Sequence, residues 1–499
     1  MPTTLKALVT GATGYLGGRL VPELIRAGHD VRVMVRDPLR IEAQAWSGDV
    51  EVAKADATDA PSVRAALEGV DVAYYLLHSI ATGDDFARTE LDMATTFVCA
   101  CEDAGVSRVV YLGGLTPADE SLSPHLGSRH AVGRLFVDSD VPAAYLRAAM
   151  VIGSGSASFE MLRYLTERLP VMVTPRWVDN LIQPIAVRDV LGYLVGCAAL
   201  APEVNRSFDI GGPDTLTYRD MMQQYATISG LPRRRIIPVP VLSPTLSSHW
   251  VGLITPVPGA LARPLVESLK HKVVCEEDDI KQHLPDPAEG LLGFTDAVRL
   301  TLSKVQNLQV PTRWSSASTA GAPSEPMPSD PDWAGGDVYL DEREREVDAS
   351  PHALWRIIEE IGGENGWYSF PLAWRIRGWL DRLSGGPGLR RGRRNPRDLV
   401  VGDVLDWWRV EAAEDGRFLR LRAEMRLPGL AWLELEVGSD EGGTTTFRQR
   451  ALFHPRGLLG HAYWWAVWPF HGIVFGSMQR NIANAAEALA TDPEADLRV

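Results

Sequence analysis

The sequence predicts an α/β domain with a doubly wound parallel sheet, followed by a smaller α+β domain with an antiparallel sheet. Three observations support this fold class. Apolar strand-like runs alternate with amphipathic helical patterns in residues 1–306. Residues 307–336 are mostly small, polar, Pro or Gly residues without apolar periodicity, which is typical of a flexible linker. In residues 337–490, several alternating segments precede one long helical pattern.

Length and composition set the outer limits. A chain of 499 residues exceeds one ordinary hydrophobic core, so more than one domain is expected. The net charge of −14 gives no general attraction for nucleic acid. Four cysteines in a chain of this length make no disulfide framework. Cys99 and Cys101 are two residues apart on an expected helix, so they point to different faces and do not easily share a metal. We therefore expect free thiols and a cytoplasmic location. We expect no membrane span.

The first half contains six segments that we expect to be strands. An amphipathic helical pattern over residues 84–105 separates the fourth from the fifth. Strands and helices that alternate at this pitch form a parallel sheet with helices on both faces. The six segments are KALVT, VRVMV, VEVAK, VAYYLL, RVVYLGG and AAYLRAA.

The second half has a different order of elements. A strand over residues 337–349 leads into a helix that Ser350 caps, with Pro351 at its first position. Four alternating segments follow, and the first two are expected to form a hairpin that turns at residues 414–416. A helical pattern closes the chain from about Leu458 to Ala490, and Pro469 is expected to kink or interrupt it. The four alternating segments are DVLDWWRVEAA, RFLRLRAEM, AWLELEVGS and TTTFRQRALFHP.

The stretch TGATGYLG joins the first expected strand to the first expected helix. In this position Gly11 makes a tight turn, Gly14 lets the backbone approach a pyrophosphate, and Gly17 lets the helix pack on the strand. The pattern therefore predicts a dinucleotide site. The residues expected to bind the cofactor at this turn are Gly11, Thr13, Gly14, Tyr15, Leu16 and Gly17.

Residues at the ends of the next strands select the cofactor. Arg36 follows the second strand, where NAD would require an acidic residue, so the sequence favours NADP, with NAD as the alternative. An exposed arginine without a role is the other interpretation. Asp56 and Ala57 are expected at the adenine, and Asp59 as a helix cap. Leu77 and His78 end the fourth strand at the ligand-binding edge, where His78 either lines the cofactor site or packs.

These segments resemble the short-chain dehydrogenase/reductase superfamily, in its extended and atypical branch that includes NmrA-like and NAD-dependent epimerase-like proteins. The resemblance covers roughly residues 1–303. It implies a Rossmann domain with a small substrate lobe over about residues 150–306. The motifs that carry it are TGATGYLG, VMVRDP, LLHS, VVYLGGL, LRAAMVIGSGSASFE, QPIAVRDVLGYL and FDIGGPDTLTYRDM.

The same resemblance implies a catalytic Ser after the fifth strand and a Tyr-x-x-x-Lys pair on the next helix. Gly113 and Gly114 stand at the serine position. The nearest equivalents of the pair are His125 and Arg129, four residues apart on one helix face. His125 suits proton donation near neutral pH, and a structural histidine is the alternative. Arg129 suits a ribose contact but does not give up its proton.

The second half resembles the START-like helix-grip fold and an uncharacterised domain that is fused to such reductases. Ten of the 15 Trp residues follow Gly336. They either line an apolar ligand cavity or fill the core. The Trp-rich stretch 464–468 leaves peripheral membrane contact open, and the basic run 388–398 is expected to be a solvated loop.

Three functions follow from these patterns. The first is NADPH-dependent hydride transfer to a small hydrophobic partner, a carbonyl or quinone-like compound. The second is a non-catalytic NADP-binding sensor or assembly factor, because the usual catalytic set is missing. The third is apolar-ligand binding by the second domain alone. Ser154 and Ser156, which follow the sixth strand, are further candidates to face a substrate.

Overall fold

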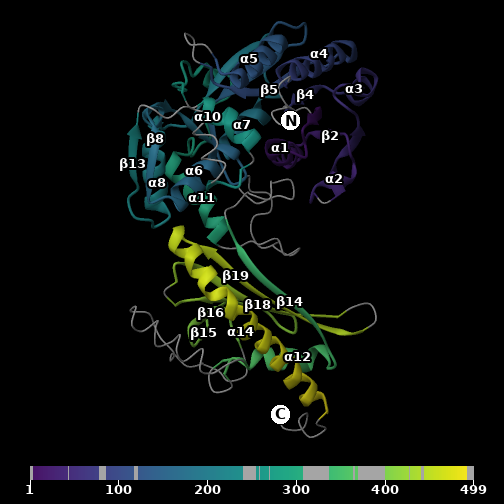
Figure 1. Ribbon diagram of the computed structural model, residues 1–499. Helices are drawn as coiled ribbons and strands as arrows, with labels where there is room; N and C mark the ends of the chain where they lie inside the picture. The colour runs from purple at the N-terminus through teal and green to yellow at the C-terminus, as the bar shows by residue number, and fades with distance from the viewer. Residues whose placement is uncertain are drawn as a thin grey trace. The chain divides into compact units, whose positions relative to one another are not determined.

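The chain divides into two compact units, Met1–Gly336 and Asp337–Val499, and we describe each by itself. Figure 1 shows the computed structural model. The predicted linker 307–336, the basic run 388–398 and His78 lie outside the described residues. The structure describes residues 4–42, 44–77, 86–116, 122–239, 254–257, 259–268, 270–306, 337–362, 366–368, 399–425, 427–439 and 443–491.

The first unit is built on a seven-stranded parallel sheet in the order β11-β6-β5-β4-β1-β2-β3. The order reverses direction between β1 and β4, which is where doubly wound sheets bind ligands. All six predicted strands are confirmed. The strands are β1 (Lys6–Thr10), β2 (Asp30–Val35), β3 (Glu51–Lys54), β4 (Val72–Tyr75), β5 (Arg108–Gly114), β6 (Ala143–Ala148) and β11 (Arg206–Ile210).

Helices cover both faces of this sheet, as expected for parallel strands. On one face α1 (Tyr15–Arg26) and α7 (Val187–Cys197) share an apolar cluster with the strands. On the other, α3 (Ala60–Leu67), α4 (Phe86–Ala104) and α5 (Pro124–Val137) bury a second cluster that is rich in Phe and Tyr. The short helix α2 (Leu39–Glu42) follows β2. The sheet is thus buried on both sides, and its strand ends remain for a ligand.

A smaller lobe with its own apolar cluster follows β6. It contains three two-stranded sheets, β10-β7, β12-β9 and β13-β8. The range predicted for this lobe, about 150–306, also includes α7 and β11, which the structure places with the large sheet. The lobe elements are β7 (Met150–Ile152), α6 (Ala157–Arg168), β8 (Val171–Pro175), β9 (Leu181–Ile182), β10 (Pro184–Ala186), β12 (Leu216–Thr217), α8 (Tyr218–Ile228), β13 (Arg235–Val239), α10 (Gly259–Ser268) and α11 (Phe294–Gln306).

The second unit is a six-stranded antiparallel sheet in the order β14-β19-β18-β17-β16-β15. Two helices, α12 (Pro351–Glu359) and α14 (Gly457–Thr491), bury one apolar cluster with the sheet. This confirms the predicted α+β architecture. The strands are β14 (Tyr339–Val347), β15 (Val404–Leu405), β16 (Trp408–Glu414), β17 (Phe418–Ala423), β18 (Gly429–Ser439) and β19 (Thr445–Pro455).

Two local signals in the second unit are confirmed, and one expected break is not found. The Ser350 hydroxyl caps α12 by accepting a bond from the Ala353 N–H at 3.2 Å. The predicted β16–β17 hairpin is present, and it turns at residues 415–417, one residue beyond the predicted 414–416, with Gly416 at φ 73°. Pro469, however, does not interrupt α14, which runs through it for 35 residues. One backbone hydrogen bond is lost there, and packing of the helix on the sheet compensates for it.

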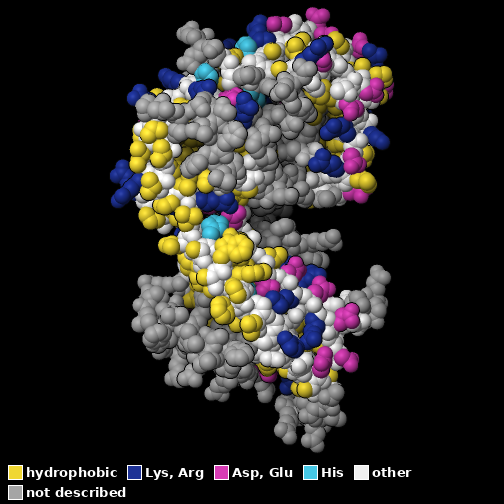
Figure 2. Space-filling view, viewed as in Figure 1, with side chains coloured by type: hydrophobic (Ala, Val, Ile, Leu, Met, Phe, Trp, Pro, Cys, Tyr) yellow, Lys and Arg dark blue, Asp and Glu magenta, His cyan; other side chains and the backbone are white. Residues whose placement is uncertain are grey.

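The first half of α14 exposes a row of large apolar side chains, which Figure 2 shows as a hydrophobic area over this helix. Trp465, Phe470 and Ile473 are all at least 60% exposed, whereas Trp464 is buried. The Trp-rich stretch therefore has two faces, of which one packs and one is exposed. Within the described parts of the chain, no helix is both long enough and apolar enough to cross a bilayer.

Candidate active site

The glycine turn between β1 and α1 has a geometry that only glycine satisfies. Gly11 has φ 67°, and a Cβ atom there would lie 2.8 Å from the Leu76 carbonyl oxygen. A Cβ atom on Gly17 would overlap the Gly11 carbonyl. Gly14 precedes the first residue of α1, and its N–H donates to the Gly11 oxygen at 2.9 Å. The turn therefore brings bare backbone and a helix N-terminus to the carboxyl edge of the sheet, which suits a phosphate group.

Two polar side chains fix this turn in place. The Thr10 hydroxyl donates to the Tyr74 carbonyl and accepts from the Leu76 N–H, both at 3.0 Å, and so ties β1 to the end of β4. The Arg19 guanidinium is buried and donates to the Ser154 carbonyl at 3.3 Å. Arg19 thereby ties α1 to the loop that follows β7. The glycine turn and the start of α1 are thus anchored to the end of β4 and to the loop that follows β7.

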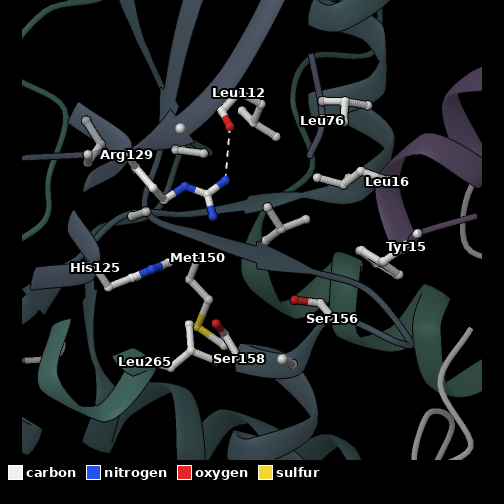
Figure 3. A pocket seen from close by; sticks show the side chains of 18 of the residues that line it. Tyr15, Leu16, Leu76, Leu112, His125, Arg129, Met150, Ser156, Ser158 and Leu265 are labelled. Atoms are coloured by element: carbon white, nitrogen blue, oxygen red, sulfur yellow. Dashed lines mark hydrogen bonds between the residues drawn. The ribbon is translucent and has the colours of Figure 1, made fainter. Parts of the chain in front are cut away.

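A cavity of about 480 Å³ begins at the glycine turn. It extends past the ends of β4, β5 and β6 to α5 and to the smaller lobe, as Figure 3 shows from close by. One continuous space therefore links a dinucleotide-type turn to a second, more apolar chamber. The second chamber is lined by Leu115, Leu126, Ala149, Met150, Ile182, Tyr218, Leu265 and Val273.

The structure brings most of the predicted site residues to this cavity. The residues Arg36, Asp56 and Ala57 do not line it, and they lie at the ends of β2 and β3 on the same edge of the sheet. The predicted residues that do line it are Gly11, Thr13, Gly14, Tyr15, Leu16, Gly17, Leu77, His125 and Arg129.

Arg36 and Asp56 lie near each other beyond β2 and β3. The backbone N–H and the hydroxyl of Thr58 donate to the Asp56 carboxylate at 2.9 and 2.7 Å. These bonds, together with the positive charge of Arg36, lower the pKa of Asp56. Arg36 is exposed, so its guanidinium is accessible to a phosphate. Asp59 holds the cap position of α3 as expected, but its side chain makes no capping bond.

His125 and Arg129 both reach the cavity from α5 (Figure 3). Ser123 caps this helix by accepting from the Leu126 N–H at 3.3 Å, so His125 belongs to its first turn. His125 is buried, and an Arg129 Nη2–H donates to the Leu112 carbonyl at 3.0 Å. That bond fixes the guanidinium beside the end of β5. A titratable ring and a permanent positive charge therefore border the same chamber.

Tyr145 occupies the space where the resemblance implies a serine. A Cβ atom on Gly113 would lie 2.6 Å from the Tyr145 ring, and one on Gly133 would overlap it. Tyr145 is buried beside Tyr111, with ring centroids 5.2 Å apart. Burial raises the pKa of Tyr145, and its hydroxyl has no hydrogen-bond partner among the described residues. Glycine at positions 113 and 133 therefore leaves the room that the Tyr145 ring occupies.

Sequence reasoning missed Tyr145 and the apolar residues of the smaller lobe. Leu265 and Val273 lie beyond the last motif of the sheet, which ends at residue 221, and no local pattern marks them as site residues. Of the two candidate serines, Ser156 lines the cavity. Ser154 is buried and outside the lining, and its carbonyl accepts from Arg19.

Fold and site together define a dinucleotide-binding domain. Residues 11–152 match the family model described as NAD(P)H-binding. The first unit therefore contains an NAD(P)H-binding domain built on a doubly wound parallel sheet. Residues 333–478 match the model of a protein family of unknown function, DUF2867, and the second unit is a separate domain of that family.

Curated relatives align with about half of this chain. A mitochondrial protein of Mus musculus, NADH dehydrogenase [ubiquinone] 1 alpha subcomplex subunit 9, is 27% identical over 258 residues. That alignment covers 49% of this chain and 66% of the relative, so the chain spans about two thirds of the relative's length. A Streptomyces griseus (4-alkanoyl-5-oxo-2,5-dihydrofuran-3-yl)methyl phosphate reductase is 26% identical over 234 residues, 46% of this chain and 75% of the relative.

Two solved structures are also similar in fold. The Citrobacter sp. triphenylmethane reductase has a TM-score of 0.49 and 21% identity, and covers 60% of this chain and 99% of its own. An Escherichia coli NADPH-dependent quinone oxidoreductase complexed with NADPH has a TM-score of 0.48 and 18% identity, and covers 59% of this chain and 99% of its own.

Proposed function

We propose that this chain is an NADPH-dependent oxidoreductase that reduces a hydrophobic carbonyl or quinone-like compound. The observation that carries the proposal is the continuity of the cavity. It joins the glycine turn to an apolar chamber, and His125 and Arg129 border the passage between them. A cofactor and an apolar substrate would therefore meet beside the only two basic side chains among the described residues that line this cavity.

The residues present fit the cofactor. Backbone at Gly11, Gly14 and Gly17 would hold the pyrophosphate, because a Cβ atom is excluded at Gly11 and Gly17 and would be tightly packed at Gly14. Arg36 would pair with the 2′-phosphate, and this supports NADP over NAD. When bound, the nicotinamide supplies the hydride. A cytoplasmic location remains a prediction.

The chain's own residues would then handle the proton and the substrate. His125 would donate a proton to the substrate oxygen as the carbonyl carbon accepts a hydride, so the C=O π bond breaks and an alcohol forms. Solvent would return the proton to His125. Arg129, fixed by the Leu112 carbonyl, would stabilise negative charge on that oxygen. The apolar walls would exclude water.

The test is NADPH oxidation by the purified chain over a panel of hydrophobic aldehydes, ketones and quinones. His125→Gln should lower kcat on any substrate found by roughly 100-fold, the usual size of a general-acid contribution, and leave NADPH affinity unchanged. The matched control is His130→Gln, which is on the same helix but outside the cavity lining. Absence of turnover above a Gly14→Asp variant would overturn the proposal, and equal activity of His125→Gln would remove His125 from it.

A second candidate is a non-catalytic NADP-binding protein. Tyr145 fills the place of the usual serine, and this favours loss of the standard catalytic set. The mouse relative is named as a subunit of a larger complex, which suits an assembly or sensor role. Tight NADPH binding without oxidation over the whole panel would support this candidate over the first.

A further inference from the structure

A second cavity, of about 470 Å³, lies in the second unit between the sheet and the first half of α14. Strands β16 to β19 and α14 supply its walls, which include Trp408, Met425, Phe453, Trp464, Phe470 and Phe475. Among the described residues that line it, none is Lys, Arg, Asp or Glu. Its size is that of a small-molecule site, and its walls are almost entirely apolar.

Stacked aromatic rings make one wall rigid. The Trp464 ring lies parallel to the rings of Phe453 and Tyr339, with centroids 5.9 and 4.9 Å away, and these two residues are partners across β19 and β14. A ring stacked on two residues of the sheet is held in place beside the cavity. Because close packing is the rule in protein interiors, a large apolar space with a fixed wall indicates an occupant.

His471 is the one histidine among the described residues that line this cavity. Its Nδ1 lies 3.2 Å from Asp341 Oδ2, and Arg343 Nε lies 3.0 Å from Asp341 Oδ1. Burial alone would raise the pKa of Asp341, but the bonds from His471 and Arg343 outweigh it and lower the pKa. Asp341 is therefore an ionised carboxylate, and its Oδ2 accepts a hydrogen bond from the Nδ1–H of His471. In the neutral ring, Nε2 is then a hydrogen-bond acceptor, and no described residue bonds to it.

Trp408 adds a donor to the same cavity. Its side chain lines the space and is only 4% exposed. The indole Nε1–H has no hydrogen-bond partner among the described residues. A buried donor left unpaired is costly, so an oxygen atom of a ligand would be stabilising here.

We propose that the second unit binds a neutral, mainly apolar molecule that carries a hydroxyl group. The hydroxyl donates to His471 Nε2, and a ligand oxygen accepts from Trp408 Nε1. A carboxylate of the same shape is disfavoured, because no Lys or Arg lines the cavity and Asp341 lies behind His471. The proposal depends on the second unit alone, and it stands or falls independently of the reductase function.

The test is calorimetric titration of the full chain with 1-decanol and with decanoate, which share one alkyl chain and differ in the head group. Decanol should bind at least tenfold more tightly than decanoate. His471→Phe keeps an aromatic ring but loses the acceptor, and should weaken decanol binding about tenfold, the value of one hydrogen bond. The control His352→Phe, an exposed histidine of α12 outside the lining, should bind as the wild type does.

Ala423→Phe is the second variant, and it places a bulky side chain in the cavity lining. It should abolish binding of both compounds, while circular dichroism and the thermal midpoint show that each variant is folded. Binding of decanol that is unchanged in His471→Phe would overturn the proposal. So would equal affinity for decanoate, or binding of neither compound by the wild type.

Discussion

At Gly17, the absence of one side-chain carbon lets α1 approach β1. An alanine Cβ there would overlap the Gly11 carbonyl. The carbonyl and the Cα of residue 17 both belong to backbone that the sheet and the helix hold in place. We expect Gly17→Ala to destabilise the first unit by roughly 1–3 kcal/mol and to abolish NADPH binding. Urea unfolding and calorimetry would measure the two effects.

The matched control for this prediction is Gly48→Ala. A Cβ atom at Gly48 would meet nothing within 4 Å, so the variant should unfold and bind as the wild type does. If Gly17→Ala left both the unfolding curve and the NADPH affinity unchanged, the steric account of the turn would be wrong.

Arg36 carries the choice between the two nicotinamide cofactors. It is exposed beyond β2, and its charge acts on Asp56 at the end of β3. Arg36→Asp should weaken NADPH binding at least tenfold, because a charge-assisted bond to the 2′-phosphate is lost and repulsion replaces it. NADH binding should stay the same or improve.

Calorimetric titration of the variant with both cofactors checks this prediction. Arg64→Ala is the control, since Arg64 is exposed and pairs with Asp103 rather than with groups near the cavity. An Arg36→Asp variant that still prefers NADPH would move the source of specificity to another residue.

At the scale of elements, a row of charges links three strands of the second sheet. Glu434 of β18 is 1% exposed, and it accepts from Arg420 of β17 at 2.7 Å and pairs with Arg450 of β19 at 2.9 Å. Glu434→Gln removes the anion that pairs with Arg420 and the nearer of the two that pair with Arg450, so we expect a loss of about 3 kcal/mol in the free energy of unfolding.

Glu344→Gln is the matched change in the same sheet. Glu344 pairs with Arg448 at 2.8 Å, but its side chain is 53% exposed, so the loss should be below about 1 kcal/mol. Chemical unfolding of the two variants compares them directly. Equal losses would show that burial does not set the strength of these pairs.

The elements were predictable where one local signal determines them. The six strands of the first sheet are apolar runs between turn signals, and α12 begins at Ser350 because a hydroxyl and a proline stand in the right order. Pro469 does not interrupt α14, because the packing of this helix is a tertiary effect that outweighs a local propensity. The two-residue strands of the smaller lobe carry too little periodicity to be recognised.

The candidate site was predictable only in its cofactor half. The glycine turn is contiguous in sequence, so its role follows from spacing. The match of Gly113 and Gly133 to Tyr145 joins three separate elements, and Leu265 reaches the cavity from α10. His471 and Asp341 are 130 residues apart, and the packing of α14 against β14 brings them together. Such contacts depend on the fold and leave no local pattern.

At the scale of the whole molecule, each unit has its own hydrophobic core. The first contains the two clusters on either face of the parallel sheet and the cluster of the smaller lobe, and the second contains one cluster between its sheet and its helices. A unit that buries its own core folds by itself. We therefore expect fragments 1–306 and 337–499 to fold separately, and the full chain to unfold in two thermal transitions.

NADPH distinguishes the two transitions. At a free concentration 100 times its Kd, the cofactor should stabilise the unit that binds it by about 2.7 kcal/mol and leave the other unchanged. Differential scanning calorimetry of the full chain and of both fragments, each with and without NADPH, measures this. The transition that moves should coincide with that of fragment 1–306. A single transition that shifts as a whole, or a fragment 337–499 that fails to fold, would contradict the prediction that the two units fold independently.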